Sequence, residues 1–151
     1  MKRFNILVIA ILLTLSCRAE TQQENTITRL STDTFKQLDL PFSQAVKVNG
    51  MLYLSGELGV KPGTLQLIEG GVTPETKQAL ENIKNTLEHF GSSMDKVVKC
   101  TLFLADIKEW PDVNKVYIQY FSGALPARSA VAGSGLGLGA RVEIECMALA
   151  Q

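Results

Sequence analysis

The stretch VVKCTLFL, residues 97–104, is largely apolar and predicts a central strand of the fold. A strand with one face in water alternates apolar and polar residues, so this run predicts a strand whose two faces are both covered. Helices from the same chain can cover one face of its sheet. The predicted elements leave the second face uncovered, and we therefore expect other copies of the chain to cover it.

One helix is predicted before this strand in the sequence and a second one after it. Residues 72–91, VTPETKQALENIKNTLEHFG, carry apolar residues at helical spacing, with Thr73 placed to cap the N-terminus and Gly91 to end the helix. Residues 109–123, EWPDVNKVYIQYFSG, form the second helix, which Gly123 ends.

The other strand signals frame these helices. Residues 45–54, AVKVNGMLYL, predict a hairpin, because Asn49-Gly50 favours a tight type I′ turn in which both central residues have positive φ. Two further strands, residues 127–133 and 140–150, flank a glycine-rich segment. The order hairpin, helix, strand, helix, strand, strand predicts an α+β fold, with two helices packed on one face of a single mixed sheet.

The N-terminus has the pattern of an export signal. Lys2 and Arg3 form a basic start, and residues 4–15 form an apolar run that is too short to span a bilayer. The sequence LTLSC then ends at Cys17, as in the lipobox of bacterial lipoproteins, whose cysteine is acylated; the alternative is a plain secretory signal. We therefore divide the chain into a signal peptide at 1–16, a polar tether at 17–28 and one folded domain at 29–151.

These features predict a periplasmic protein that is anchored through lipid on Cys17. Acyl chains on that cysteine hold a protein firmly at a membrane. Arg18 follows it, at the position where an aspartate typically retains lipoproteins at the inner membrane, so we expect the outer membrane.

Charge and cysteine content argue against several classes of function. The chain has 15 basic and 15 acidic residues, and removal of the signal peptide leaves 13 basic ones and a net charge of −2. This balance disfavours a nucleic-acid partner, which needs clustered Lys and Arg. With one histidine and no CxxC pair, the sequence predicts neither a metal site nor a bound cofactor. Cys100 and Cys146 lie in apolar strands, where we expect buried free thiols rather than the disulfide that export would permit.

Charged residues in the C-terminal strands are the candidates for chemistry. Arg128 sits between Pro126 and a run of small residues, where it is either solvated at a strand end or placed for a ligand. Glu143 and Glu145 share one face of the last strand by period-two alternation, so the residues alone do not choose between them.

Taken together, these segments resemble the RidA family, also called the YjgF family. The resemblance covers residues 41–150 and is carried by LYLSGELG, ALENIKNTLEHFGSSMDKVVKCTLFLADIKEWPDVNKVY, LPARSAV and VEIECMALA. It implies a chorismate-mutase-like α+β fold, assembled as a homotrimer in which the sheets form an inner barrel and the clefts lie between subunits.

The resemblance also implies site residues. The arginine of the family's P-x-R motif, which holds the substrate carboxylate, matches Arg128, and the first glutamate of its E-I-E strand, which positions or activates water, matches Glu143. Ser55 and Gly56 match the Ser-Gly pair that follows the family's second strand. The remaining cleft residues by the family pattern are Asn114, with Tyr117 close by, and two departures, Phe42 in place of tyrosine and Ala130 in place of cysteine.

Many members of this family hydrolyse reactive enamines and imines to 2-keto acids and ammonia. The resemblance therefore implies a deaminase that acts, without a cofactor, on a small substrate bearing a carboxylate. Because Ala130 can act neither as nucleophile nor as acid, the reaction would run without covalent catalysis there. The alternative is a module of the same fold that binds a small carboxylate without turnover. A nuclease role, reported for some relatives, is disfavoured by the acidic balance of the chain.

Overall fold

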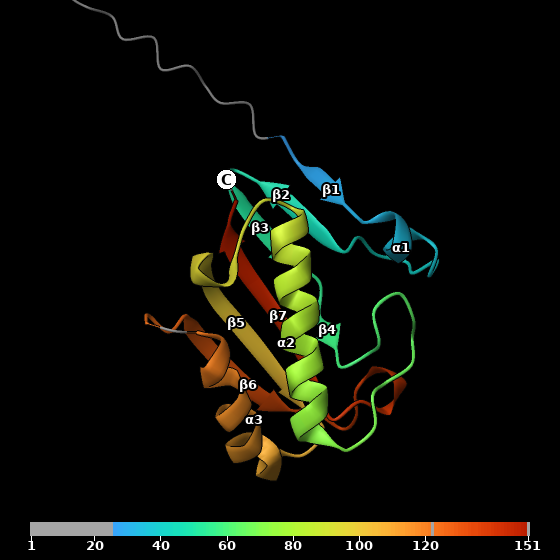
Figure 1. The fold of residues 1–151 in the computed structure, drawn as a ribbon, viewed down its shortest axis with the longest axis vertical. Helices are drawn as coiled ribbons and strands as arrows, with labels where there is room; N and C mark the ends of the chain where they lie inside the picture. Colours follow the sequence, from blue (N-terminus) through green and yellow to red (C-terminus); the bar gives the residue numbers. More distant parts are fainter. Residues whose placement is uncertain (1–25, 122, 151) are drawn as a thin grey trace, which may run out of the picture.

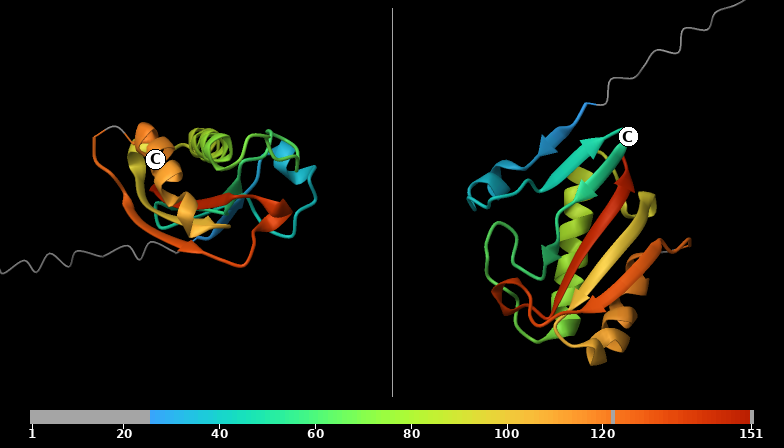
Figure 2. Two further views of the ribbon diagram at one scale, coloured as in Figure 1. Left: turned by 90° about the horizontal axis from the view of Figure 1, so that it is seen from below. Right: turned by 180° about the vertical axis from the view of Figure 1, so that it is seen from behind.

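The computed structural model describes residues 26–121 and 123–150, so the predicted signal peptide, Cys17 and most of the tether lie outside the described residues. The chain forms one mixed sheet with α2 and α3 packed on the same face (Figures 1 and 2). The strands are β1 (Thr28–Leu30), β2 (Ala45–Val48), β3 (Met51–Leu54), β4 (Glu57–Leu58), β5 (Val97–Leu104), β6 (Ala127–Ala132) and β7 (Val142–Leu149). The helices are α1 (Asp33–Lys36), α2 (Val72–His89) and α3 (Trp110–Tyr117), with 3-10 turns at Met94–Lys96, Ile107–Glu109, Ile118–Tyr120 and Gly137–Gly139.

The sheet topology confirms the predicted α+β architecture. The strands run in the order β1-β2-β3-β7-β5-β6, and the short β4 pairs with β7. Neighbours are antiparallel except for β5 and β6, which are parallel and are joined through α3. None of the helices in the described part of the chain has the length and apolar character that a membrane span requires. The trimeric barrel stays a prediction.

The predicted hairpin is confirmed. Val48 at the end of β2 stands opposite Met51 at the start of β3, and Asn49 and Gly50 form the turn between them. Their φ angles are 50° and 73°, as a type I′ turn requires.

The assignment of Thr73 as the N-cap of α2 is wrong, because Thr73 already lies inside the helix. The cap is Gly71, with φ at 84°, and Val72 is the first helical residue. Val72 is buried in the core, so its packing draws it into the first turn and moves the cap back along the chain. Pro74 fits the first turn, because its nitrogen needs no partner there. Gly91 ends the helix as predicted, with φ at 78°.

Helix α3 is shorter than predicted. It ends at Tyr117, and the 3-10 turn Ile118–Tyr120 follows it before Gly123 is reached. The tighter turn brings Phe121 back into the core, where its ring centroid lies 4.6 Å from that of Tyr117.

The core lies between the sheet and the two helices, and alternate residues of the central strands point into it. These include Cys100, Leu102 and Leu104 of β5, all fully buried. On the other face the strands carry half-exposed residues, which are Lys99, Thr101 and Phe103 of β5 and Glu143, Glu145 and Met147 of β7. The second face is therefore more polar than the run at 97–104 indicates, although Phe103 and Met147 remain partly uncovered on it.

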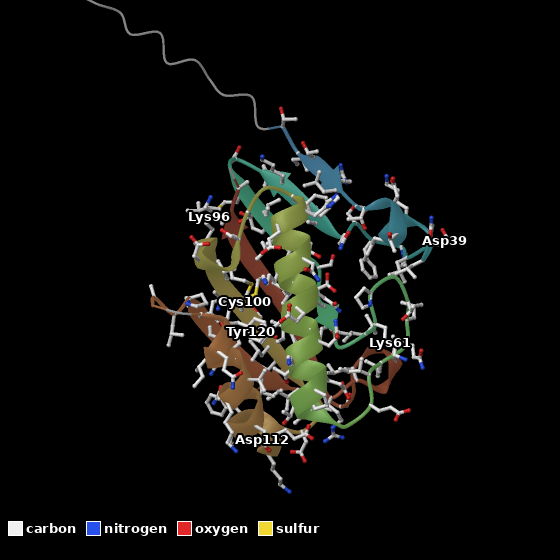
Figure 3. The ribbon with its side chains drawn as sticks, in the orientation of Figure 1. Asp39, Lys61, Lys96, Cys100, Asp112 and Tyr120 are labelled. Carbon is white, nitrogen blue, oxygen red and sulfur yellow. A yellow bond between two sulfur atoms is a disulfide. The ribbon has the colours of Figure 1, made fainter. Side chains whose placement is uncertain are left out.

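Cys100 and Cys146 form a disulfide, so the prediction of free thiols is wrong (Figure 3). The two residues stand directly opposite each other in the antiparallel pair β5–β7, with their Cα atoms 4.2 Å apart, and both are fully buried. Antiparallel strands bring the closer of their two kinds of facing pair to about 4.5 Å, which is within reach of a disulfide. The two cysteines are 46 positions apart in the sequence, so the local sequence of neither strand predicts that they face each other.

The disulfide leads to the first prediction. Tryptic digestion without reduction should yield one linked species that joins peptides 100–108 and 142–151, and reduction should separate them in a mass spectrum. Replacing both cysteines with alanine should lower the free energy of unfolding by about 2–4 kcal/mol, because the bond closes a long loop. Recovery of both peptides with alkylated cysteines, from protein treated with the alkylating reagent in denaturant without reductant, would contradict the assignment.

Candidate functional site

The predicted site residues lie in two groups on different sides of the molecule. The glycine–glutamate group comprises Phe42, Ser55, Gly56 and Glu143, around the end of β3, the start of β4 and the start of β7. The arginine group comprises Asn114 and Tyr117 on α3 and Arg128 and Ala130 on β6. The structure therefore brings together the residues of each group but does not bring the two groups together.

Gly56 and Glu143 are in close contact, and the contact depends on glycine. A Cβ atom built on Gly56 would collide with the Glu143 carboxylate and would lie 2.7 Å from its Cδ atom. The next two residues of the chain, in β4, pair with β7, and Leu58 is the direct partner of Glu143. The short strand thus holds the backbone of Gly56 against the carboxylate, where only a residue without a side chain fits.

The surroundings of Glu143 favour the protonated form of its carboxyl group. Burial raises its pKa above the ordinary value, and the negative charge of Glu145 on the same strand face raises it further. A carboxyl with a raised pKa can hold a proton closer to neutral pH and can exchange it with a substrate or water.

Ser55 and Phe42 are both placed by the chain that leads into β2. The Ser55 hydroxyl donates to the Ser43 carbonyl at 2.7 Å, and its backbone N–H donates to the Gln44 carbonyl at 3.1 Å. Since its proton is already engaged, the Ser55 oxygen can act toward a ligand only as an acceptor. Phe42 is half exposed and packs edge-on against Phe35, with ring centroids 5.9 Å apart.

The Arg128 guanidinium lies over two aromatic rings. Its guanidinium carbon is 4.8 Å from the centroid of the Tyr117 ring and 5.9 Å from that of Trp110. The rings support the face of the guanidinium and leave its N–H edge for hydrogen bonds. No carboxylate in the described part of the chain forms an ion pair with Arg128.

The polar atoms beside Arg128 are not satisfied within one chain. The Asn114 Oδ1 atom and the Tyr117 hydroxyl are buried, and neither has a hydrogen-bond partner among the described residues. Burial also raises the pKa of Tyr117 to about 12, while the charge of Arg128 partly opposes this, so the phenol stays neutral. Buried polar atoms normally find a partner, and a polar ligand or a neighbouring copy would supply it here.

The sheet itself separates Arg128 from Glu143. Arg128 pairs in register with Cys100, whose side chain points toward the helices, whereas Glu143 points to the opposite face. Two strand spacings and three residues along β7 place their backbones roughly 14 Å apart. A ligand that contacts both side chains would therefore need two copies of the chain.

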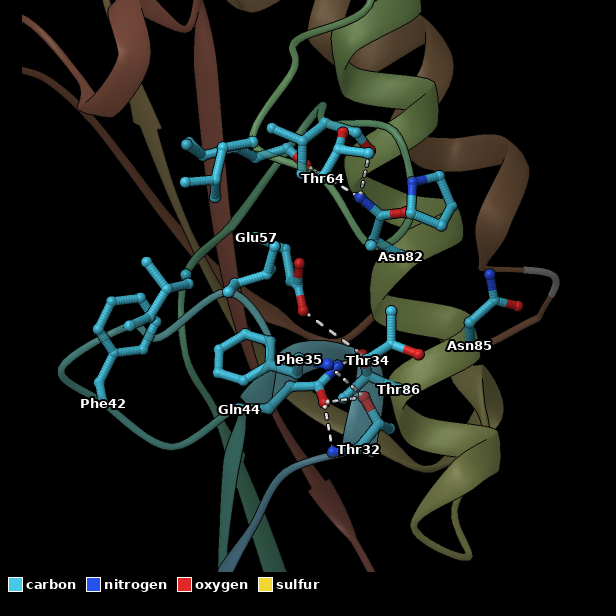
Figure 4. Close-up of a pocket in the computed structure, with 18 of the residues that line it drawn as sticks. Thr32, Thr34, Phe35, Phe42, Gln44, Glu57, Thr64, Asn82, Asn85 and Thr86 are labelled. Carbon is cyan, nitrogen blue, oxygen red and sulfur yellow. Dashed lines mark hydrogen bonds between the residues drawn. The ribbon is translucent and has the colours of Figure 1, made fainter.

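A pocket that the sequence did not predict lies on the helix side of β4 (Figure 4). Its volume is about 570 Å³, and Phe42 and Gly56 line it together with residues of α1, α2 and the turn at Gly137–Gly139. Its walls are largely apolar and include Phe35, Leu38, Leu40, Leu58, Val60 and Leu138. Arg128, Glu143 and Ser55 do not line it.

Glu57 points into this pocket, toward Thr86 of α2 (Figure 4). The Thr86 hydroxyl accepts a hydrogen bond from Gln44 Nε2 at 2.9 Å and donates its own proton to Glu57 Oε1 at 3.4 Å. Gln44 is held in turn by Thr32, whose N–H and hydroxyl both donate to Gln44 Oε1. Burial raises the pKa of Glu57 to about 7, and the Thr86 hydrogen bond lowers it only in part. The signal that sequence analysis passed over is an acidic residue directly after Ser55-Gly56.

The raised pKa of Glu57 gives a prediction on stability. The carboxyl titrates near pH 7 in the folded protein and near 4.5 in the unfolded chain, so the stability that its protonation contributes is complete below pH 4.5 and is lost as the pH rises through 7. Glu57→Gln should therefore be more stable than the wild type at pH 8, by on the order of 2 kcal/mol, and equally stable at pH 4. Urea denaturation of both proteins at the two pH values measures this. A stability difference that is the same at pH 4 and pH 8 would show that the carboxyl is not buried as described.

The described residues contain no group of three His, Cys, Asp or Glu side chains that could hold a metal ion.

Comparison with known proteins finds close relatives. Residues 36–150 match the family described as Endoribonuclease L-PSP. The chain is 49% identical over 109 residues to the bovine 2-iminobutanoate/2-iminopropanoate deaminase, a match that covers 72% of this chain and 80% of the relative. It is 45% identical over 109 residues to the human protein of the same name, with the same coverage of 72% and 80%.

Solved structures with the same fold include two bacterial proteins. RidA from an Antarctic Psychrobacter superposes with a TM-score of 0.70 at 39% identity, covering 73% of this chain and 89% of that one. A member of the conserved Rid protein family from Yersinia pestis superposes with a TM-score of 0.76 at 39% identity, covering 82% and 99%.

Proposed function

The chain belongs to the RidA (YjgF) family, and we propose that it hydrolyses reactive 2-amino enamines and 2-imino acids to 2-keto acids and ammonia. The observation that carries this proposal is that each chain holds an arginine without an ion-pair partner and a glutamate with a raised pKa, at the positions that the family pattern assigns to the substrate carboxylate and to water. Relatives at 45–49% identity that are named 2-iminobutanoate/2-iminopropanoate deaminases support it.

The active site is assembled between copies of the chain in a homotrimer. Arg128 of one subunit meets Gly56 and Glu143 of the next, which is the arrangement that their separation by the sheet favours. The unsatisfied Asn114 and Tyr117 oxygens beside Arg128, and the partly uncovered sheet face with Phe103 and Met147, support an interface at both places.

Arg128 binds the substrate carboxylate. A guanidinium donates two parallel hydrogen bonds to a carboxylate and stays charged when water is excluded. The Tyr117 and Trp110 rings fix the plane of the guanidinium, so the substrate meets a donor pair whose orientation is already set.

Glu143 moves the protons. An enamine first takes a proton on its terminal carbon from the protonated Glu143 carboxyl and becomes an iminium ion. The ionised Glu143 then accepts a proton from water as the water oxygen adds to the iminium carbon, which gives a neutral carbinolamine. The carbinolamine hydroxyl proton passes to nitrogen as the C–N bond breaks, so ammonia leaves and the 2-keto acid remains.

A second candidate is a module that binds a small carboxylate without turnover, and Ala130 favours it because it supplies no proton-transferring group next to Arg128. The mechanism above needs no such group, since water attacks a carbon that is already electrophilic. Thermal stabilisation by 2-ketobutyrate without any release of keto acid from imines would select this second candidate.

The assignment of Arg128 gives a prediction on activity. Arg128→Ala should lower kcat/KM by about a hundredfold, because a substrate carboxylate is left without its charged donors. Arg128→Lys should also be impaired, since an ammonium keeps the charge but loses the paired donors. The measurement is keto acid release from imines that an amino acid oxidase generates in the same solution. The control is Arg29→Ala, which removes an exposed arginine on β1. Full activity in both Arg128 variants would refute the binding of the substrate carboxylate by Arg128.

We also propose that the protein is exported and lipid-anchored on Cys17. The signal pattern supports this, as does the disulfide between Cys100 and Cys146, because such bonds persist in oxidising compartments and are rare in the cytosol.

Cell fractionation tests the location. The wild-type protein should sediment with membranes and be released by detergent, whereas Cys17→Ala should lose the membrane fraction, because two or more acyl chains are needed for firm anchoring. Intact mass should show the chain beginning at an acylated Cys17. Recovery of wild-type protein from the cytosol with Met1 or Lys2 at its N-terminus would contradict the proposal.

A further inference from the structure

The pocket beside the proposed active site presents one unneutralised carboxylate among apolar walls. Glu57 forms no ion pair within the part of the chain that the structure describes, and its hydrogen bond from Thr86 is long, at 3.4 Å. The Gln44–Thr86–Glu57 chain fixes where the carboxylate stands. A partly buried carboxylate among apolar walls is costly without a cation beside it, unless the protein needs it for a ligand.

The pocket adjoins the proposed site through two shared residues. Gly56 lines the pocket and also contacts the Glu143 carboxylate, and Phe42 lines it from the segment that holds Ser55. Glu57 points to the helix side of the sheet and Glu143 to the opposite side, so a substrate whose reacting carbon lies near Glu143 reaches Glu57 only by passing its side chain around the backbone of Gly56. The volume of about 570 Å³ falls in the range of small-molecule sites and far exceeds what an ethyl or methyl group fills.

We propose that this pocket binds the substrate's side chain, and that the preferred substrates are 2-imino acids with an extended alkyl side chain ending in a cationic nitrogen that pairs with Glu57. The inference rests on the proposed function for its reaction and on the pocket for its specificity. The apolar walls, such as Leu58 and Leu138, take the methylene groups, and the carboxylate takes the charge at the end. A neutral alkyl chain of equal length would leave Glu57 without a partner, so the site discriminates against it.

The first arm of the test is binding and needs no turnover. At pH 8, n-pentylammonium should raise the melting temperature of the full-length protein more than n-pentanol does, and Glu57→Gln should abolish the difference. Glu88→Gln, which removes an exposed carboxylate of α2 outside the pocket, is the matched control and should retain it. Equal stabilisation by the two probes, or an unchanged difference in Glu57→Gln, would overturn the proposal.

The second arm is specificity of turnover. An oxidase generates imines of arginine, norleucine and 2-aminobutyrate, and the arginine side chain is chosen because its guanidinium is a poor nucleophile toward its own imine. The ratio of kcat/KM for the arginine imine over the norleucine imine should exceed one and fall about tenfold or more in Glu57→Gln, while Glu88→Gln keeps it. A ratio that Glu57→Gln does not change would refute the side-chain assignment.

The two arms separate this inference from the proposed function. If no imine is hydrolysed but the ammonium probe binds through Glu57, the deaminase proposal fails and the cation pocket stands. If the imines are hydrolysed with no dependence on Glu57, the deaminase stands and the pocket assignment fails.

Discussion

The alternation of side chains across the sheet determines the faces to which Arg128 and Glu143 point, and so how the two residues can act together. Strand β6 lies parallel to β5 and sets Arg128 beside Cys100 on the helix face, while β7 sets Glu143 on the other face. A one-residue slip of either strand would exchange the faces. The Cys100–Cys146 disulfide links β5 to β7 between these two positions and holds that register. In the proposed mechanism the carboxylate clamp and the proton carrier are therefore both present in every chain, but they meet only between chains.

Each half of the site is prepared by its neighbours before any ligand arrives. Aromatic rings orient the Arg128 guanidinium, and no ion pair with a described residue neutralises it. The close packing of Gly56 against Glu143 partly desolvates the carboxylate and favours its protonated form. In our proposal the pocket around Glu57 lies next to the second half, so that different residues recognise the two ends of the substrate and catalyse the reaction at its centre. Above neutral pH the ionised Glu57 lowers the stability of the folded protein, as expected of a group that is retained for a ligand.

Local patterns in the sequence were enough to predict the elements, while long-range pairing was not. Asn49-Gly50 defines its turn by φ alone, and the helical spacing from Ala79 to Leu87 defines α2, so both could be predicted. Thr73 is a plausible cap by residue type, but the buried Val72 lies in the first turn, so Gly71 takes the cap position. The disulfide was missed because strand register is a tertiary property. Glu57 was missed because its neighbours in the pocket come from segments as far apart as Thr32 and Leu138. The family pattern assigns Arg128 and Glu143 to the site, and only the sheet shows that their side chains point to opposite faces.

Mixing two inactive proteins tests whether Arg128 and Glu143 act across a subunit boundary. Arg128→Ala and Glu143→Gln would be coexpressed with different affinity tags, and trimers that carry both tags would be purified. In a cyclic trimer of either mixed composition, one site of three receives both intact residues, so activity should return to about one third of the wild-type value per trimer. Mixed trimers that are no more active than their parents would contradict the account.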